Sequence, residues 1–175
     1  THIDSMNGQY KVSWPALGEL QESWADRVDM QLTSLITCDT FEAQEYKDIA
    51  HTVANCGGIL GMVAYPIPDL KKILLGHLET AGNLDLALDF HTDETLVPGS
   101  ETLRLIAECV IETGFSAPVM VGHCCSLSQQ EEARAMDTLD LMAEAELNAV
   151  SPPMCNMYLQ DRHAARTPRA RGVTL

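Results

Sequence analysis

Two side chains that can do chemistry, His91 and Glu94, stand where an apolar segment gives way to polar residues. The segment reads LALDFHTDETL over residues 86–96. A neutral imidazole can bind a divalent metal ion, and a nearby carboxylate can take up and release protons. The pair therefore predicts either metal-assisted acid–base chemistry or, in the simpler interpretation, a strand that ends in a polar turn.

The next apolar segment also ends in a histidine. In PVMVGHCC, residues 118–125, Val119, Val121 and His123 occupy alternate positions, which a strand places on one face. One histidine at a strand end is more often structural than catalytic. Two histidines on successive strands, with a carboxylate beside one of them, favour metal-assisted chemistry.

The remaining histidines and the cysteines give weaker signals. His2, in the sequence THID, is a third candidate for the same edge of the sheet. His51 and His77 fall in predicted helices, where we expect surface positions. The six cysteines form no CxxC pair, so we interpret them as reduced thiols, each of them most simply a small buried apolar residue.

Strand-like and helix-like segments alternate along the whole chain. Strands are expected where apolar and polar residues alternate, and helices where apolar residues recur every three or four positions. Ser13 and Ser100 are expected to cap two of the helices. The expected strands cover residues 2–4, 28–37, 58–65, 84–91, 118–123 and 147–151, and the expected helices cover residues 14–27, 41–56, 69–81, 101–114 and 130–146.

This alternation predicts an α/β fold with a parallel sheet. No glycine-rich phosphate loop follows any strand, so a TIM-type barrel is favoured over a nucleotide-binding fold. We expect one domain over residues 1–175, a partial TIM-type (β/α)8 barrel with about six of the eight βα units of that architecture, truncated at both ends.

Alternation along residues 84–91 assigns His91 to the inside of such a barrel. The same face carries small and acidic residues, namely Asp85, Ala87 and Asp89. The opposite face carries bulky residues that would pack beneath helices, namely Leu84, Leu86, Leu88 and Phe90. In TIM barrels the carboxyl ends of the strands hold the active site, so His91 and Glu94 are expected at the mouth.

Composition and charge exclude several other functions. The formal net charge of −14 repels phosphate backbones, so we expect no nucleic-acid partner. No apolar run approaches the roughly 20 residues of a membrane span, and no signal segment opens the sequence. We therefore expect a cytoplasmic protein that acts on a small-molecule substrate.

Six motifs, in this order, resemble bacterial-type cytosine deaminase and its close relatives in the amidohydrolase superfamily. They are THID, RVDMQLTSL, LDFHTDE, VMVGHCCSL, CNMYLQDR and TPRARGVTL. The resemblance covers essentially the whole chain. It implies a metal-dependent TIM-barrel hydrolase that turns an exocyclic amine on an N-heterocycle into a carbonyl.

The resemblance also implies roles for single residues. His91 matches the histidine that binds the catalytic divalent metal, iron or zinc. Glu94 matches the glutamate that contacts the substrate and carries protons to the ring and the leaving amine. His123 matches the histidine that steadies the water activated by the metal.

Two departures from the family pattern shape the expectation. The family's H-x-H metal pair would precede Thr1 and its last metal-binding aspartate would follow Leu175, so we expect an incomplete metal site and no activity from this chain alone. The substrate-binding glutamine of well-known members aligns with Thr37, which has only a hydroxyl to offer. The substrate is therefore expected to differ from cytosine.

Two alternatives stay open at this point. An amidohydrolase acting on another C–N bond, in a triazine or a cyclic amide, fits the same motifs. A non-catalytic remnant fits the missing metal ligands. A homo-oligomeric full-length parent protein is a further expectation.

Overall fold

The computed structural model describes residues 1–160, 162, 165, 167 and 172. Most of the segment TPRARGVTL lies outside these residues. Strands alternate with helices throughout, as the sequence predicts. The strands are β1 His2–Asp4, β2 Thr33–Leu35, β3 Leu60–Ala64, β4 Leu88–Thr92, β5 Val119–His123 and β6 Asn148–Val150, and the helices are α1 Tyr10–Trp24, α2 Gln44–Asn55, α3 Leu70–Asn83, α4 Thr102–Thr113, α5 Glu132–Glu144 and α6 Pro153–Leu159, with short 3-10 helices at Cys38–Thr40 and Cys125–Gln129.

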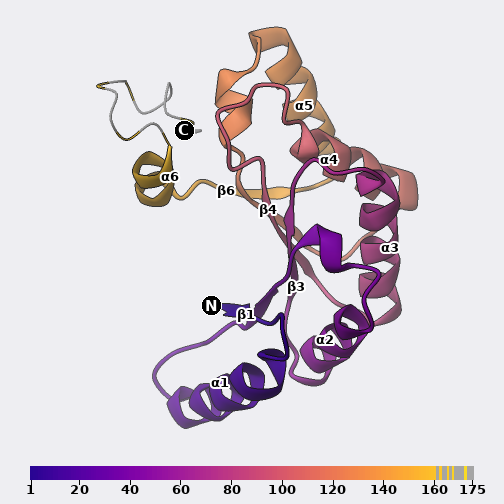
Figure 1. The fold of residues 1–175 in the computed structure, drawn as a ribbon, viewed down its shortest axis with the longest axis vertical. Coiled ribbons are helices and arrows are strands. Elements are labelled where there is room, and N and C mark those ends of the chain that lie inside the picture. The colour runs from indigo at the N-terminus through magenta and orange to yellow at the C-terminus, as the bar shows by residue number, and fades with distance from the viewer. Residues whose placement is uncertain (161, 163–164, 166, 168–171, 173–175) are drawn as a thin grey trace.

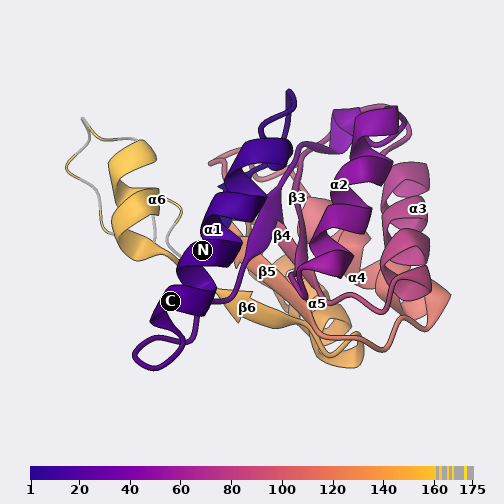
Figure 2. The same ribbon diagram turned by 90° about the horizontal axis from the view of Figure 1, so that it is seen from below.

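All the paired strands run parallel and follow one another in chain order. β1 and β2 pair and form the first ladder. β3, β4, β5 and β6 pair in this order and form the second ladder. Single parallel bridges, Thr33 with Ile59 and Thr37 with Val63, join the two ladders. Helices α2 to α5 line one side of the strands and α6 lies on the other (Figure 1). Figure 2 shows α1, α2 and α3 following one another around the strands. This order is that of a TIM-type barrel.

The core lies between the strands and the outer helices. Met62, Phe90 and Val121 stand side by side on β3, β4 and β5 and are fully buried. They belong to the hydrophobic cluster that includes Leu74 and Leu78 of α3. Their burial fixes the register, because a slip by one residue would turn each bulky side chain to the inner face.

The joint between β2 and β3 depends on a glycine. The Ser34 hydroxyl accepts a hydrogen bond from the backbone N–H of Gly61 at 2.9 Å and lies 3.3 Å from the Gly61 carbonyl oxygen. A Cβ atom on Gly61 would collide with the carbonyl oxygen of Ser34. Only glycine lets the two strands approach this closely.

Several element starts differ from the prediction. β2 begins at Thr33 rather than at residue 28, and the starts of α1 and β4 bear on residues named above. Ser13 lies inside α1 rather than capping it, and its hydroxyl donates to the carbonyl oxygen of Gln9 at 2.9 Å. β4 begins at Leu88 rather than at residue 84. The preceding residues complete the C-terminal turn of α3, where Asp85 has φ +54° and the N–H of Leu86 donates to Ala81. Asp85 is therefore in an exposed turn and not on the inner face of a strand.

His77 was predicted at the surface of a helix and is instead completely buried. Its Nδ1 lies 2.8 Å from the Tyr46 hydroxyl, and its ring packs edge-on against Phe90. Burial lowers the pKa of His77 to about 3, so the imidazole stays neutral in the folded protein. His51, in contrast, is exposed as predicted.

None of the helices in the described part of the chain is both long enough and apolar enough to span a bilayer.

The buried His77 makes stability depend on pH. Its pKa is lower in the folded chain than in the unfolded chain, so the unfolded chain gains the extra proton as pH falls below about 6.5. The contribution of the neutral, buried His77 to the free energy of unfolding is complete above about pH 6.5 and is lost progressively as pH falls below this value. Between pH 7 and pH 5 we expect the free energy of unfolding to fall by about 2 kcal/mol through this residue. Urea denaturation at both pH values measures it.

The matched controls are His77→Gln and His51→Gln. The first variant should lose this part of the pH dependence, and the second should keep it. An equal fall in stability for the wild type and His77→Gln would show that His77 is not the responsible group.

Candidate functional site

The predicted site residues gather at the carboxyl ends of the strands. Register places Thr37, Val63, His91, Gly122 and Val150 in one row across β2 to β6. Strands in a sheet lie about 4.8 Å apart, so Thr37 is about 10 Å from His91 along the row. His123 follows Gly122 directly and Glu94 lies three residues after His91, so both strand-end histidines and Glu94 lie at this edge of the sheet.

His91 lies on the inner face of β4 beside two further side chains of the kinds that can bind a metal ion. The rings of His2 and His91 meet edge to face at a centroid distance of 4.5 Å. His2 Nε2 also lies 3.1 Å from Asp89 Oδ2. One ligand atom from each of these three residues lies within 4.8 Å of the others. His91 is thus not alone on the inner face.

Burial and neighbouring charge keep His91 neutral. Partial burial lowers the pKa of His91, and the nearby imidazoles of His2 and His123 lower it further, against the opposing effect of Asp89. The neutral imidazole is the form that binds metals. Two nitrogens and one carboxylate oxygen are also a donor set that iron and zinc accept. The residues present therefore fit a divalent metal ion.

His123 reaches His91 through an unusual backbone. Strand alternation predicts His123 on the face of Val119 and Val121, but His123 has φ +71° and Cys124 has φ +50°. This left-handed pair breaks the alternation, and His123 Nε2 comes within 3.3 Å of His91 Nδ1. Such conformations cost about 1–3 kcal/mol in non-glycine residues, and they cluster at functional sites.

Glu94 stands in the loop after β4 and faces His123. Its Oε1 lies 3.4 Å from His123 Nδ1, and its side chain is 33% exposed. The backbone carbonyl of Glu94 accepts a hydrogen bond from Gln160 at 3.0 Å, and the Cys155 thiol lies 3.9 Å from its carboxylate. A carboxylate that stands between a histidine and an open cleft is well placed to move protons.

The cleft beside Glu94 has a volume of ≈ 700 Å³. Its walls come from the end of β3, the end of β4 and the loop up to residue 100. They include Tyr65, His91, Asp93, Glu94, Val97 and Ser100. The space is sufficient for a one- or two-ring heterocycle.

Thr37 does not line this cleft. Its hydroxyl donates to Asp39 at 2.5 Å and also lies 3.4 Å from the Met6 sulfur. The hydrogen bond from Thr37 lowers the pKa of Asp39, and Tyr65 contributes a weaker one. The side chain of Thr37 is therefore linked to the cleft wall through Asp39 and Tyr65.

The six cysteines are free thiols, as predicted. Four are buried, and Cys56 and Cys155 are exposed. Burial raises the pKa values of Cys124 and Cys125 to about 12, so both thiols beside His123 stay protonated and are poor metal ligands.

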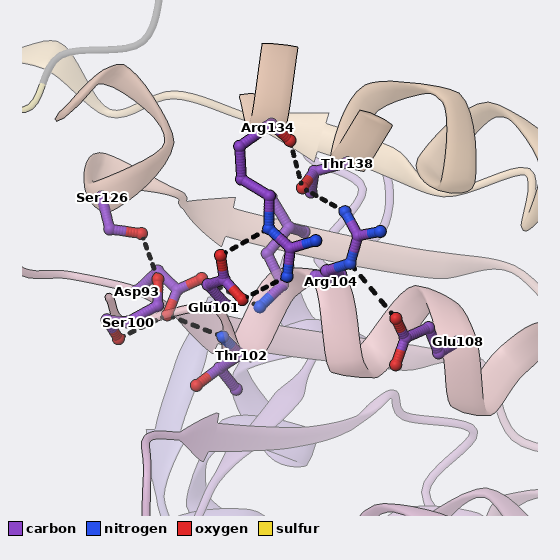
Figure 3. Close-up of polar contacts among 10 residues, drawn as sticks. Asp93, Ser100, Glu101, Thr102, Arg104, Glu108, Ser126, Arg134 and Thr138 are labelled. Atoms are coloured by element: carbon purple, nitrogen blue, oxygen red, sulfur yellow. Dashed lines mark hydrogen bonds and ion pairs between the residues drawn. The ribbon is translucent and has the colours of Figure 1, made fainter. Parts of the chain in front are cut away.

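Sequence reasoning missed Asp93, which holds the loop that carries Glu94. Asp93 is buried with φ +52°. Its Oδ1 accepts hydrogen bonds from the Ser100 hydroxyl at 2.7 Å and the Thr102 N–H at 3.1 Å, and its Oδ2 accepts one from the Leu103 N–H at 2.9 Å (Figure 3). Asp93, and not Ser100, therefore caps α4. Burial raises the pKa of Asp93 even though these hydrogen bonds act to lower it.

A second set of polar contacts in Figure 3 braces the helices behind this loop. Arg134 of α5 donates to both carboxylate oxygens of Glu101, through Nε at 2.7 Å and through a terminal nitrogen at 2.5 Å. Arg104 of α4 donates to the Thr138 hydroxyl at 3.2 Å. These contacts join α4 to α5 behind the mouth.

Replacing Asp93 tests its role as the cap. Asp93→Asn keeps the shape and the tolerance of a left-handed conformation, but its amide nitrogen cannot accept from the Leu103 N–H. We expect a loss of about 2–3 kcal/mol in the free energy of unfolding, measured by urea denaturation. Asp85→Asn, at an exposed residue with similar φ, is the control and should change stability by less than about 0.5 kcal/mol. Equal effects of the two substitutions would contradict the capping role.

The whole chain is similar to a known deaminase. It is 42% identical over 176 residues to pterin deaminase of Rhizobium rhizogenes (strain K84 / ATCC BAA-868). The match takes in all of this chain and 40% of that protein, so the chain spans about two fifths of the length of the curated relative. No protein-family model matches the chain.

Solved structures show the same fold. The crystal structure of 5-methylcytosine deaminase from Klebsiella pneumoniae liganded with phosphonocytosine matches with a TM-score of 0.81 at 22% identity, over 99% of this chain and 43% of that one. N-isopropylammelide isopropylaminohydrolase from Burkholderia multivorans ATCC 17616 matches with a TM-score of 0.64 at 19% identity, over 99% and 44%. These matches confirm the partial TIM-type barrel. Together with the curated relative they confirm the resemblance to cytosine deaminases and their relatives.

Proposed function

We propose that this chain forms part of a metal-dependent hydrolytic deaminase acting on an aminated N-heterocycle. The observation that carries the proposal is the contact of His91, His123 and Glu94, from two successive strand ends, beside an open cleft. The name of the curated relative supports the same class of reaction. The proposal concerns the whole protein, of which residues 1–175 would be a partial barrel domain.

The inner face of the barrel would hold the metal. His91 is the proposed ligand from this chain, and His2 and Asp89 add donor atoms next to it. A bound iron or zinc ion would supply a water whose pKa is lowered to about 7. The orientation of that water would fall to His123, whose Nε2 faces His91.

Glu94 would carry the protons of the reaction. Water adds to the ring carbon that bears the amine, and the proton it gives up passes through Glu94 to a ring nitrogen. Glu94 then takes the proton of the new hydroxyl group and delivers it to the amine, so that the C–N bond breaks, the carbonyl forms and ammonia leaves. The carboxylate stands beside His123 and the cleft, which is the position that both transfers need.

A pterin is favoured over cytosine as the substrate. The curated relative is a pterin deaminase, and Thr37 replaces the glutamine expected for a cytosine site. The cleft has room for two fused rings. We propose that Thr37, together with Glu94, contributes to substrate binding. The Thr37 hydroxyl contacts the Asp39 carboxylate, and Thr37 would influence the substrate through this carboxylate.

Ammonia release is the direct test. The complete gene product, loaded with zinc or with iron, should release ammonia from pterin faster than from cytosine. N-isopropylammelide, which carries a different hydrolysable C–N bond, should be a poor substrate. A preference for this triazine would support the alternative amidohydrolase reaction, and no turnover of any aminated ring with either metal would contradict the proposal.

Substitutions of His91 and Glu94 separate metal binding from proton transfer. His91→Ala removes a ligand, so both metal content and activity should fall. Glu94→Gln keeps the size of the side chain and removes the titratable group, so metal should remain bound while kcat falls. We expect a fall of about 10⁴-fold, the upper end for a general acid–base group, because Glu94 serves two transfers. Metal analysis and steady-state kinetics measure both effects.

His51→Ala and Glu79→Gln, at exposed positions on α2 and α3, are the matched controls and should leave metal content and kcat unchanged. Near-normal kcat in Glu94→Gln, or loss of its metal, would show that the role of Glu94 is assigned wrongly.

Thr37→Gln tests the substrate side. The longer amide offers both a donor and an acceptor to a ring edge, so kcat/KM for cytosine should rise relative to that for pterin. The ratio of the two values measures the effect and is insensitive to the amount of active enzyme. A lower ratio would mean that residue 37 does not face the substrate in this way.

A further inference from the structure

Asn156, which lies on α6, is fully buried against the site. Its Oδ1 lies 2.9 Å from His123 Nδ1. No hydrogen-bond partner of its Nδ2 is found among the described residues, although that atom is also buried. An unpaired buried donor lowers the free energy of unfolding by about 1–3 kcal/mol, so stability alone does not explain an asparagine at position 156. The contact of its Oδ1 with His123 points instead to a role at the site.

Two acceptors converge on the same nitrogen of His123. The Asn156 Oδ1 lies 2.9 Å from Nδ1, and the Glu94 carboxylate lies 3.4 Å from it. Neither oxygen can donate when Glu94 is ionised, so Nδ1 must carry the proton. In a neutral imidazole Nε2 then has a free lone pair, and Nε2 is the atom that faces His91 at 3.3 Å.

The reverse orientation of the amide is disfavoured. It would point the Asn156 Nδ2 at His123 and leave Nδ1 without a proton. The Nδ1 lone pair would then face the Glu94 carboxylate, and like lone pairs repel. Glu94 and Asn156 therefore select the same tautomer, each from a different element of the fold.

We infer that Asn156 is a positioning residue that fixes the His123 proton on Nδ1 and keeps Nε2 as the acceptor facing the metal side of the site. The left-handed backbone of His123 breaks the strand alternation, and Asn156 and Glu94 contact its ring at that point. The expected effect on kcat rests on the proposed deaminase function, whereas the expected tautomer of His123 does not.

Nitrogen NMR of the protein labelled with 15N-histidine tests the tautomer directly. His123 is identified by the loss of its signals in His123→Asn. The wild type should show protonated Nδ1 and unprotonated Nε2. The opposite pattern in the wild type would overturn the inference without any substitution at Asn156.

Substitutions then show whether Asn156 is responsible. Asn156→Leu keeps the approximate shape and removes the nearer acceptor, so only the longer contact from Glu94 remains and the Nδ1-protonated form should lose part of its dominance. Asn156→Asp keeps an acceptor and should keep Nδ1 protonated. Asn55→Leu, at an exposed residue of α2, is the control and should change nothing. An unchanged tautomer in Asn156→Leu would overturn the inference.

Kinetics of the metal-loaded protein give the second measurement. Partners of this kind typically contribute about 10–100-fold to activity, so kcat of Asn156→Leu should fall by that factor with little change in KM. Asn156→Asp should recover most of the loss. If ammonia release is absent even in the wild type, the deaminase proposal fails while the NMR result still decides the inference. If kcat falls but the tautomer stays, the inference fails and the deaminase proposal stands.

Discussion

The hydrogen bonds of the buried Asp93 carboxylate fix the loop on which the site depends. Asp93 accepts from the first N–H groups of α4 and from Ser100, so the chain that leaves β4 is tied to the next helix within one turn. His91 precedes this anchor and Glu94 follows it. The helix N-terminus favours the negative charge, which offsets part of the cost of burying it. The hydrogen bonds of Asp93 therefore hold His91 and Glu94 in position.

The inner face of the barrel adds donors that no single motif contains. His2 comes from β1, whereas Asp89 and His91 come from β4, and only the curvature of the sheet brings them together. From His91 the polar contacts continue to His123. The site is thus a connected set of polar groups on the inner face of the sheet.

Sequence alternation predicted the position of His91 because a regular strand repeats every two residues. It could not predict that of His123, because the left-handed turn breaks the repeat. The cap from Asp93 was missed since it acts across a loop rather than beside the helix, where Ser100 was expected. The burial of His77 was in principle readable, because Leu74, Leu78 and Ala81 share its helical face. The order of the parallel strands followed directly from the alternation of strand and helix.

The joint between β2 and β3 has a consequence for how the chain folds. The ladder from β3 to β6 is continuous, whereas its connection to β2 in the described residues consists of two single bridges and the close approach of Ser34 to Gly61. Each ladder is built from neighbouring βα units, whose contacts are local in sequence and form quickly. We therefore expect the two ladders to open as separate units in native-state hydrogen exchange. His2 would then join His91 only when the second unit docks, so the face that carries His2, Asp89 and His91 would be the last part of the sheet to form.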